Sequence, residues 1–485
     1  VEMPYHSETK VVIPMETCDQ GAFLMVSSRG RYLYSEKQHE VRIGGGYIQW
    51  DGEDVELGTG HKNMRGAYME IAQKYFGRDS GIPDKTFFAV PQYNTWIELM
   101  YNQNQRDIIR YAEEIIRNRM SPGVLMIDEG WSNDYGIFEF SRERFDDPKG
   151  MVDHLHQLGF TVMLWVVPLI SPDSNVFREL RGTDILLRDE NGEIAVRKWW
   201  NGYSAVLDVS NPKSLEWFSA RLDECMEKYG VDGFKFDSGD SYLYRADDSS
   251  AKSAQPLDFT HFYNEIGKKY RYNEFRAAWN VKGAPYVCRL QDKNHSWGTD
   301  GLRAIIPDIL LQGILGCFYG CPDMVGGGAY GSFLGDFQAD GELYVRWLET
   351  SALMPMMQFS IAPWRILDEE HFQIVKEYSS LHEKYSGLFL NLAEQAALTK
   401  EPILRYMEYE FPGEGFEQIN DQYMLGGNIM VAPVLEKDAR ERKVKLPIGR
   451  WRHGGRVYEG GKWFTLKAGI DELLVFEKID ASSSY

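Results

Sequence analysis

The chain of 485 residues has little of what several classes of protein require. Its five cysteines are odd in number and fit no zinc spacing, which argues against a disulfide framework and favours buried thiols. No apolar run approaches the roughly 18 residues of a membrane span. Basic residues number 53 against 72 acidic ones, and the net charge of −19 argues against a nucleic acid or an anionic membrane as partner.

Targeting and metal-binding signals are also scarce. No secretory leader is visible, although the chain begins at Val1 and its start could be trimmed. The single N-glycosylation sequon, Asn294–Ser296, falls inside a predicted active-site loop, which favours a cytoplasmic protein. Histidines and cysteines do not cluster among the candidate site residues, which argues against a transition metal and leaves Mg²⁺ or Ca²⁺ as the alternative. We expect neither a metal nor a cofactor.

The hydrophobic pattern divides the chain into three predicted domains. Residues 1–85 show short alternating segments typical of antiparallel strands, and residues 396–485 return to that pattern as a predicted β-sandwich. Between them, residues 86–395 alternate strands with amphipathic helices such as Pro212–Tyr229, which predicts a (β/α)8 barrel with long insertions. A doubly wound open sheet is the alternative, but no predicted strand precedes a Gly-rich phosphate loop. The predicted strands are 87–90, 124–127, 161–167, 231–236, 286–289, 315–319 and 357–361.

The segment Val231–Asp240 is the centre of the functional prediction. Its apolar residues predict a short buried strand, and Ser238 and Gly239 end that strand directly after Asp237. Barrel enzymes carry their chemistry at such strand ends. Asp237 is therefore a candidate catalytic group, and the alternative is a carboxylate that caps a helix or closes a turn.

Further polar residues follow the other predicted strands and should meet at the same rim. They are Asp128, Trp165, Arg289 with Asp292, Asp323 and Gln358. Carboxylates with aromatic and arginine neighbours fit glycoside hydrolysis, which needs one carboxylate below the anomeric carbon and one protonated acid at the glycosidic oxygen.

The same segments resemble the motifs of glycoside hydrolase family 31 in their order along the chain. Lys235–Asp240 resembles its K-x-D-x-G-E nucleophile motif, with Asp240 in place of glutamate. Ile127–Trp131 resembles its I-D-x-x-W strand, and Leu164–Pro168 resembles its W-x-x-P strand. Residues 430–451 resemble the first part of its C-terminal sandwich. The N-terminal region, at about 85 residues, is shorter than is usual in the family.

Other segments resemble the branch of this family that contains the myogenesis-regulating glycosidase, which is regarded as an α-galactosidase. They are residues 199–208, 289–298, 322–327, 346–349 and 354–360. The resemblance implies Asp237 as nucleophile and Asp292 as general acid/base of a retaining double displacement. Asp300 is the rival acid, and Asp292 is preferred because Arg289 precedes it at the same strand end.

The remaining candidates would bind the sugar. Lys235 and Arg289 would hold carboxylates ionised or bind hydroxyls, although Lys235 could equally form a structural ion pair. Asp128 would accept hydrogen bonds from the terminal sugar, and Trp165 and Trp297 would wall the pocket or pack in the core. Asp323 would bind substrate or serve as a buried turn carboxylate.

We therefore expect an exo-acting α-glycosidase for a small oligosaccharide or glycoside, most simply an α-galactoside. An α-glucosidase on the same machinery and a sugar-binding protein without activity are the alternatives, and a homo-oligomer is left open.

Overall fold

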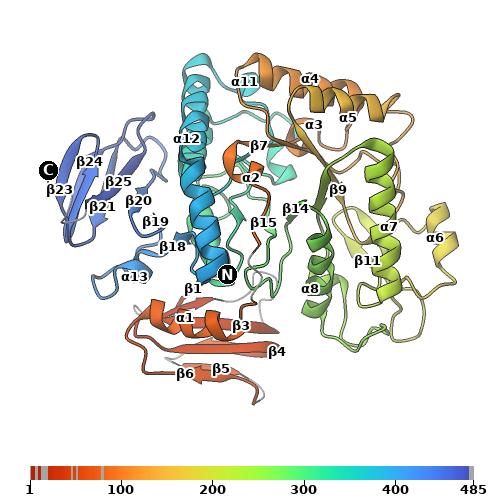
Figure 1. Ribbon diagram of the computed structural model, residues 1–485, viewed down its shortest axis with the longest axis horizontal. Helices are drawn as coiled ribbons and strands as arrows, with labels where there is room; N and C mark the ends of the chain where they lie inside the picture. The colour runs from red at the N-terminus through yellow and green to blue at the C-terminus, as the bar shows by residue number, and fades with distance from the viewer. Residues whose placement is uncertain are drawn as a thin grey trace.

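The computed structural model describes residues 2–5, 9–12, 20–44, 47–50, 53–77 and 81–479, with side chains described in 26–35, 53–77 and 81–479. An eight-stranded parallel sheet curves into a barrel at its centre (Figure 1). The strands follow the order β16-β15-β14-β13-β9-β8-β7-β17, and a parallel bridge between Met324 and Gln358 joins the ends of the sheet. The predicted (β/α)8 barrel is confirmed. The strands are β7 (Gln92–Asn94), β8 (Val124–Ile127), β9 (Thr161–Val166), β13 (Gly233–Phe236), β14 (Tyr272–Phe275), β15 (Val287–Arg289), β16 (Gly320–Cys321) and β17 (Gln358–Phe359).

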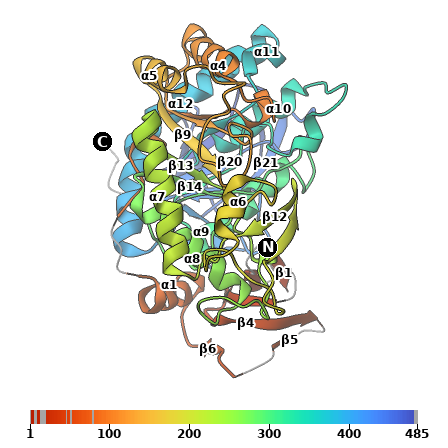
Figure 2. The same ribbon diagram turned by 90° about the vertical axis from the view of Figure 1, so that its right-hand side faces the viewer.

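Helices cover the outside of the barrel, and both views place α7 outside strand β9 (Figures 1 and 2). Four buried thiols, Cys225, Cys288, Cys317 and Cys321, are free, while Cys18 lies outside the described residues. None of the helices in the described part of the chain is long and apolar enough to cross a membrane. The helices of six or more residues between the first barrel strand, β7, and the last, β17, are α4 (Gln105–Arg117), α5 (Pro148–Gln157), α6 (Asn175–Leu180), α7 (Pro212–Tyr229), α8 (Pro256–Ile266), α9 (Ile305–Ile314) and α10 (Gly341–Ala352).

The connection from α7 to β13 shows how the sequence directs Asp237 toward the barrel mouth. The Asn211 side chain accepts a hydrogen bond from the Lys213 backbone N–H, and Pro212 occupies the first helical turn. Gly230 ends the helix in the left-handed conformation, at φ 79°. The strand that follows is buried at all four positions, and Gly233 lies where a Cβ would meet a backbone oxygen of β14 at 2.0 Å. The strand therefore points its carboxyl end, and Asp237, toward the barrel mouth.

Two predicted strands were placed wrongly, and one was missed. Residues 87–90 do not open the barrel, because Thr86–Ala89 form the short helix α2 and β7 begins at Gln92. Val90 is extended, at φ −144° and ψ 159°, as is usual for a residue before proline, so the chain becomes a strand only after Pro91. Residues 315–319 precede β16, and β14 has no counterpart in the predicted set.

A small antiparallel sheet is inserted between β9 and α7. It consists of β10 (Leu169–Ile170), β11 (Val196–Trp199) and β12 (Gly202–Val206), in the order β10-β12-β11. The turn between β11 and β12 brings Trp200 and Asn201 to the barrel mouth, where they contact Glu129 at the end of β8. This hairpin thus contributes to the site although it lies outside the barrel.

Antiparallel sheets lie before and after the barrel in the chain. The first, with helix α1 (Met64–Tyr75), consists of β1 (Glu2–Tyr5), β2 (Thr9–Val12), β3 (Gln20–Ser27), β4 (Tyr32–Gly44), β5 (Tyr47–Trp50) and β6 (Glu56–Gly58). The long helix α12 (Glu369–Thr399) separates the barrel from the C-terminal sheets in Figure 1. Those sheets consist of β18 (Leu404–Arg405), β19 (Tyr423–Leu425), β20 (Ile429–Ala432), β21 (Glu441–Leu446), β22 (Arg450–His453), β23 (Arg456–Glu459), β24 (Lys462–Lys467) and β25 (Leu474–Ile479).

The C-terminal sheets have their own core but are bound to the barrel. Their core gathers around Trp451 and Phe476, which are fully buried. Arg346 on α10 is buried as well, and its Nη2 donates to the backbone oxygens of Ala439 and Ala468. Because these contacts are inaccessible to water, they fix the C-terminal sheets against the barrel.

Candidate active site

A cavity of about 460 Å³ opens at the carboxyl ends of the barrel strands. Five of the residues predicted from the sequence line it, namely Asp128, Trp165, Lys235, Asp237 and Asp292. The aromatic side chains of Trp96, Tyr101, Trp200, Tyr242 and Tyr330 form much of the remaining wall. This mixture of carboxylates and aromatic faces suits a polar ligand with apolar faces, such as a sugar ring.

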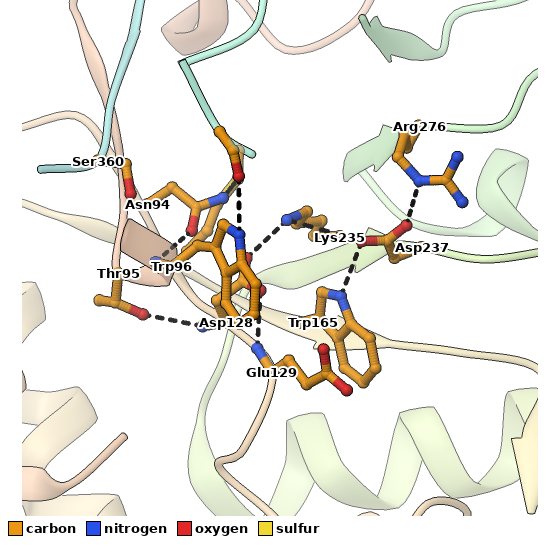
Figure 3. Close-up of polar contacts among 12 residues, drawn as sticks. Asn94, Thr95, Trp96, Asp128, Glu129, Trp165, Lys235, Asp237, Arg276 and Ser360 are labelled. Atoms are coloured by element: carbon orange, nitrogen blue, oxygen red, sulfur yellow. Dashed lines mark hydrogen bonds and ion pairs between the residues drawn. The ribbon is translucent and has the colours of Figure 1, made fainter. Parts of the chain in front are cut away.

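Asp237 directly follows β13 and is held by four donors or cations. Its Oδ1 accepts from Arg276 Nε at 2.6 Å and from the Ser238 backbone N–H at 2.7 Å. Its Oδ2 accepts from Trp165 Nε1 at 2.9 Å and lies 3.8 Å from Lys235 Nζ (Figure 3). Burial opposes ionisation, but the charges of Arg276 and Lys235 outweigh it and hold the pKa of Asp237 well below its usual range. This carboxylate is ionised and fixed, as a nucleophile must be.

The backbone turns sharply after Asp237. Ser238 and Gly239 have positive φ values of 57° and 74°, so the chain leaves the strand through two left-handed residues. A Cβ on Gly239 would approach the Tyr263 ring to 2.4 Å, so this position requires glycine. The turn carries Asp240 back toward Arg276, and both are largely buried.

Lys235 and Asp128 form a buried ion pair in the floor of the cavity. Lys235 Nζ donates to Asp128 Oδ2 at 2.6 Å, and each side chain is at most 3% exposed. Burial alone would lower the pKa of Lys235, but Asp128 raises it, so the lysine keeps its charge. The Asp128 backbone N–H is held by Thr95 Oγ1, which fixes the end of β8. Lys235 is thus both an ion-pair partner and part of the cavity lining.

Arg276 is the most important residue that the sequence prediction missed. It follows β14, and besides its bond to Asp237 it donates to both oxygens of Asp240, through Nη1 at 2.8 Å and Nη2 at 2.5 Å. A guanidinium shared by two carboxylates is held in one orientation by its fork geometry. The substitution of aspartate for glutamate at position 240 is therefore compatible with a tight bidentate contact.

Asp292 lines the same cavity in a different environment. Its side chain is 36% exposed, and its Oδ1 accepts from Arg289 Nη1 at 2.7 Å. Arg289 itself is 1% exposed and does not line the cavity, so its role is to hold Asp292 from behind. The same Nη1 donates to Asp323 Oδ1 at 2.8 Å.

Four other candidates do not reach the cavity wall. Asp323 is fully buried and contacts Arg289 and the Lys293 backbone N–H. Gln358 lies inside the barrel, where its Nε2 donates to Glu274. Trp297 donates from Nε1 to Asp340 at 3.1 Å, and Asp300, the rival acid, accepts from Ser296 and Asn294 on its own exposed loop. Because none of the four lines the cavity, none is placed to touch a ligand there.

Glu129 is a second residue that sequence analysis did not single out. It lines the cavity beside Asp128 and accepts from Tyr135 Oη at 2.6 Å, Asn201 Nδ2 at 3.0 Å and Trp200 Nε1 at 3.2 Å. Burial raises the pKa of Glu129 to about 7, against the opposing effect of these hydrogen bonds. Its position directly after Asp128 was the available sequence signal.

The described residues contain no group of three or more His, Cys, Asp or Glu side chains arranged to hold a metal ion. Asp128, Asp237 and Asp292 are instead paired with Lys235, Arg276 and Arg289, respectively. The chemistry that this arrangement supports is nucleophilic and acid/base catalysis by carboxyl groups.

Known proteins share this architecture. Residues 85–386 match the glycosyl hydrolases family 31 TIM-barrel domain, and residues 400–481 match the glycosyl hydrolase family 31 C-terminal domain. The myogenesis-regulating glycosidase of Mus musculus is 35% identical over 401 residues, which are 80% of this chain and 56% of that protein. Alpha-glucosidase 2 of Bacillus thermoamyloliquefaciens is 23% identical over 78% of this chain and 51% of its own length.

Solved structures agree with the fold. A family 31 α-xylosidase from a soil metagenome, complexed with xylose, superposes with a TM-score of 0.80 at 20% identity, covering 97% of this chain and 75% of that one. The chain spans little more than half the length of the curated relatives named here. The family models cover most of the chain, so it belongs to glycoside hydrolase family 31.

Proposed function

We propose that the protein is a retaining, exo-acting α-glycosidase that removes a terminal α-linked hexose. The observation that carries this proposal is a pair of carboxyl groups, Asp237 and Asp292, that line one sugar-sized cavity in opposite environments. Asp237 is buried among donors and cations, whereas Asp292 is partly exposed and shares its one arginine with Asp323. Such a division of environments separates a nucleophile from an acid.

In the proposed mechanism, Asp237 attacks the anomeric carbon as Asp292 gives its proton to the leaving oxygen. Arg276 and Trp165 hold the two Asp237 oxygens, which aims the carboxylate into the cavity. Asp292 then takes a proton from water, which attacks the glycosyl-enzyme and releases the sugar with its configuration retained. Asp128 and Lys235, in the cavity floor, would bind the hydroxyls of the terminal sugar.

An α-galactoside is the substrate that we propose first, on the resemblance of residues 289–298 and 322–327 to the corresponding branch of the family. An α-glucoside and an α-xyloside are the competing substrates, because proteins named as acting on such sugars are among the relatives. Hydrolysis of p-nitrophenyl α-galactoside, α-glucoside and α-xyloside in parallel would rank the three. Release of the β-anomer first, seen by NMR, would contradict double displacement, and no turnover of any α-glycoside would favour a sugar-binding protein.

Asp292→Ala tests the acid assignment. We expect kcat/KM to fall by about 10²- to 10⁴-fold for a disaccharide, because the leaving sugar then departs without a proton. The loss should be much smaller for a p-nitrophenyl glycoside, whose leaving group needs little protonation. Asp300→Ala is the matched control, since this exposed carboxylate lies outside the cavity and should leave both rates unchanged. Equal losses of Asp292→Ala on both substrates would remove Asp292 from the role of acid.

A further inference from the structure

Three carboxyl groups surround the single guanidinium of Arg289. Asp292 and Asp323 both accept from Nη1, at 2.7 and 2.8 Å, and Glu274 Oε1 lies 3.3 Å from Nε. Arg289, Asp323 and Glu274 are at most 1% exposed, whereas the Asp292 side chain is 36% exposed in the cavity. The group therefore places one carboxyl group in the cavity and two beneath it.

Arg289 contacts all three carboxyl groups, and burial raises the pKa of Glu274 against the charge of Arg289 and, to a smaller extent, that of Lys235. Lys235, on the neighbouring strand β13, is engaged by Asp128 at 2.6 Å and lies 3.8 Å from Asp237. Lys293 follows Asp292 but turns away to Asp308 on α9, at 2.6 Å. Negative charges on three buried or half-buried carboxyl groups around one guanidinium repel one another, so each weakens the hold of Arg289 on the other two.

The hydrogen bonds show how the two buried carboxyl groups are held beneath the cavity. Asp323 accepts through both oxygens, from Arg289 at Oδ1 and from the Lys293 backbone N–H at Oδ2. Burial, with a smaller contribution from Asp292, raises the pKa of Asp323 to about 6 against the opposing charge of Arg289. Glu274 Oε1 and Arg289 Nε are buried without a hydrogen bond, so their contact is one of charge alone. Of the three, only Asp292 presents a partly exposed carboxyl group to the cavity.

We propose that Asp323 is a positioning residue for Asp292, because it shares Arg289 Nη1 from beneath the cavity and so weakens the hold of the arginine's charge on the Asp292 carboxyl group. Glu274 acts in the same direction from the Nε side. The inference rests on the proposed glycosidase function, in which the Asp292 proton passes to the leaving oxygen as the C–O bond breaks, and returns from the attacking water. In this arrangement Arg289 orients Asp292 while its charge is shared with the two buried carboxyl groups.

Asp323→Asn tests the proposal. Asparagine keeps an acceptor for Arg289 and tolerates the left-handed backbone at position 323, where φ is 61°. Loss of the negative charge that competes at Nη1 strengthens the effect of Arg289 on Asp292, so Asp292 should give up its proton at a lower pH. We expect the basic limb of the kcat/KM profile on a disaccharide to move down by about 1 unit or more, with the acidic limb unchanged. Glu274→Gln should move the same limb in the same direction, and Asp300→Asn should not move it.

A titration that needs no turnover separates this inference from the proposed function. With carboxyl-¹³C-aspartate incorporated, the Asp292 resonance is identified by its absence from Asp292→Asn. Its midpoint should lie at lower pH in Asp323→Asn than in the wild type, whether or not any glycoside is hydrolysed. Unchanged midpoints in both Asp323→Asn and Glu274→Gln, at an unchanged thermal unfolding midpoint, would show that these residues are merely structural and would overturn the proposal.

Discussion

The two sides of the cavity differ in the balance of their charges. On the side of Asp237, two cations and an indole N–H approach one carboxylate, although Arg276 also pairs with Asp240 and Lys235 with Asp128. On the side of Asp292, one arginine serves three carboxyl groups. Two cations thus approach Asp237, whereas the single arginine at Asp292 is shared with two further carboxyl groups.

This difference supports the proposed roles, which the residue types alone do not distinguish, since both groups are aspartates. A carboxylate held by cations is ionised and fit for attack, whereas a carboxyl group in an acidic environment retains a proton and is fit to donate it. The comparison also indicates that each side depends on residues behind it, namely Arg276 on one side and Asp323 with Glu274 on the other.

Replacing Asp237 should have the largest effect on activity, because it removes the proposed nucleophile. Asp237→Asn keeps the shape and an acceptor for Arg276 but removes the nucleophile, so we expect kcat to fall on the order of 10⁴-fold or more with good and poor leaving groups alike. Rates on p-nitrophenyl and disaccharide substrates measure this. Retention of more than about a tenth of the wild-type rate, at an unchanged unfolding temperature, would contradict the nucleophile assignment.

Removing Arg276, one of the two cations beside Asp237, should lower activity less than removing Asp237, and by an amount that depends on pH. Arg276→Gln takes away the partner that most strongly lowers the pKa of Asp237, so this pKa should rise. The nucleophile must be ionised, and activity is lost as pH falls through its pKa. The acidic limb of kcat/KM should therefore move up by about 1 unit or more, while the basic limb stays in place.

Arg271→Gln is the matched control for Arg276→Gln. Arg271 precedes β14 but is 71% exposed and pairs with Asp84, away from the cavity. Arg271→Gln should leave both limbs of the kcat/KM profile against pH unchanged. A shift of the basic limb in Arg276→Gln would contradict the division into two sides, because it would show that Arg276 also governs the acid.

The missed strand explains why the sequence prediction found the carboxylates but not Arg276. Asp237 follows a strand whose apolar residues are evident, whereas β14 has only four residues and includes Asn273 and Glu274. Both are fully or almost fully buried, since they form hydrogen bonds and ion pairs within the barrel wall. A buried strand that satisfies polar side chains by tertiary contacts has no hydrophobic pattern to detect.

The loop after β15 shows a second limit of sequence reasoning. Asp292, Trp297 and Asp300 lie within nine positions, and all were candidates. The first is held toward the cavity by Arg289, whereas Trp297 turns to Asp340 at the start of α10. The partner of Trp297 lies 43 residues away in the chain, and Asp300 bonds within its own loop, so sequence order alone cannot select among the three. The barrel, by contrast, followed from the strand and helix periodicity over about 300 residues.

Replacing Glu129 should have the smallest effect on activity of the variants considered. Glu129 is a buried carboxyl group that accepts from neutral donors, with no bonded cation among the described residues. Burial raises its pKa from 4.5 to about 7, so its contribution to stability is fully present below pH 4.5 and is lost as pH rises through 7. The loss is about 3 kcal/mol at most. Glu129→Gln cannot ionise, so the wild type should lose stability relative to this variant between these two pH values, with an activity change at pH 5 below about tenfold.

Thermal unfolding of both proteins across pH 4 to 8 measures this difference. The test is how the difference in unfolding temperature changes with pH, and not its size at any one pH. Glu224→Gln is the control, because Glu224 is an exposed carboxylate on α7 paired with Arg221. Its unfolding temperature should run parallel to that of the wild type. A parallel course for Glu129→Gln as well would mean that the pKa of Glu129 in the folded protein equals its ordinary value of 4.5, so that it is ionised at neutral pH. The three hydrogen bonds from Tyr135, Trp200 and Asn201 would then suffice to hold a buried carboxylate without a cation.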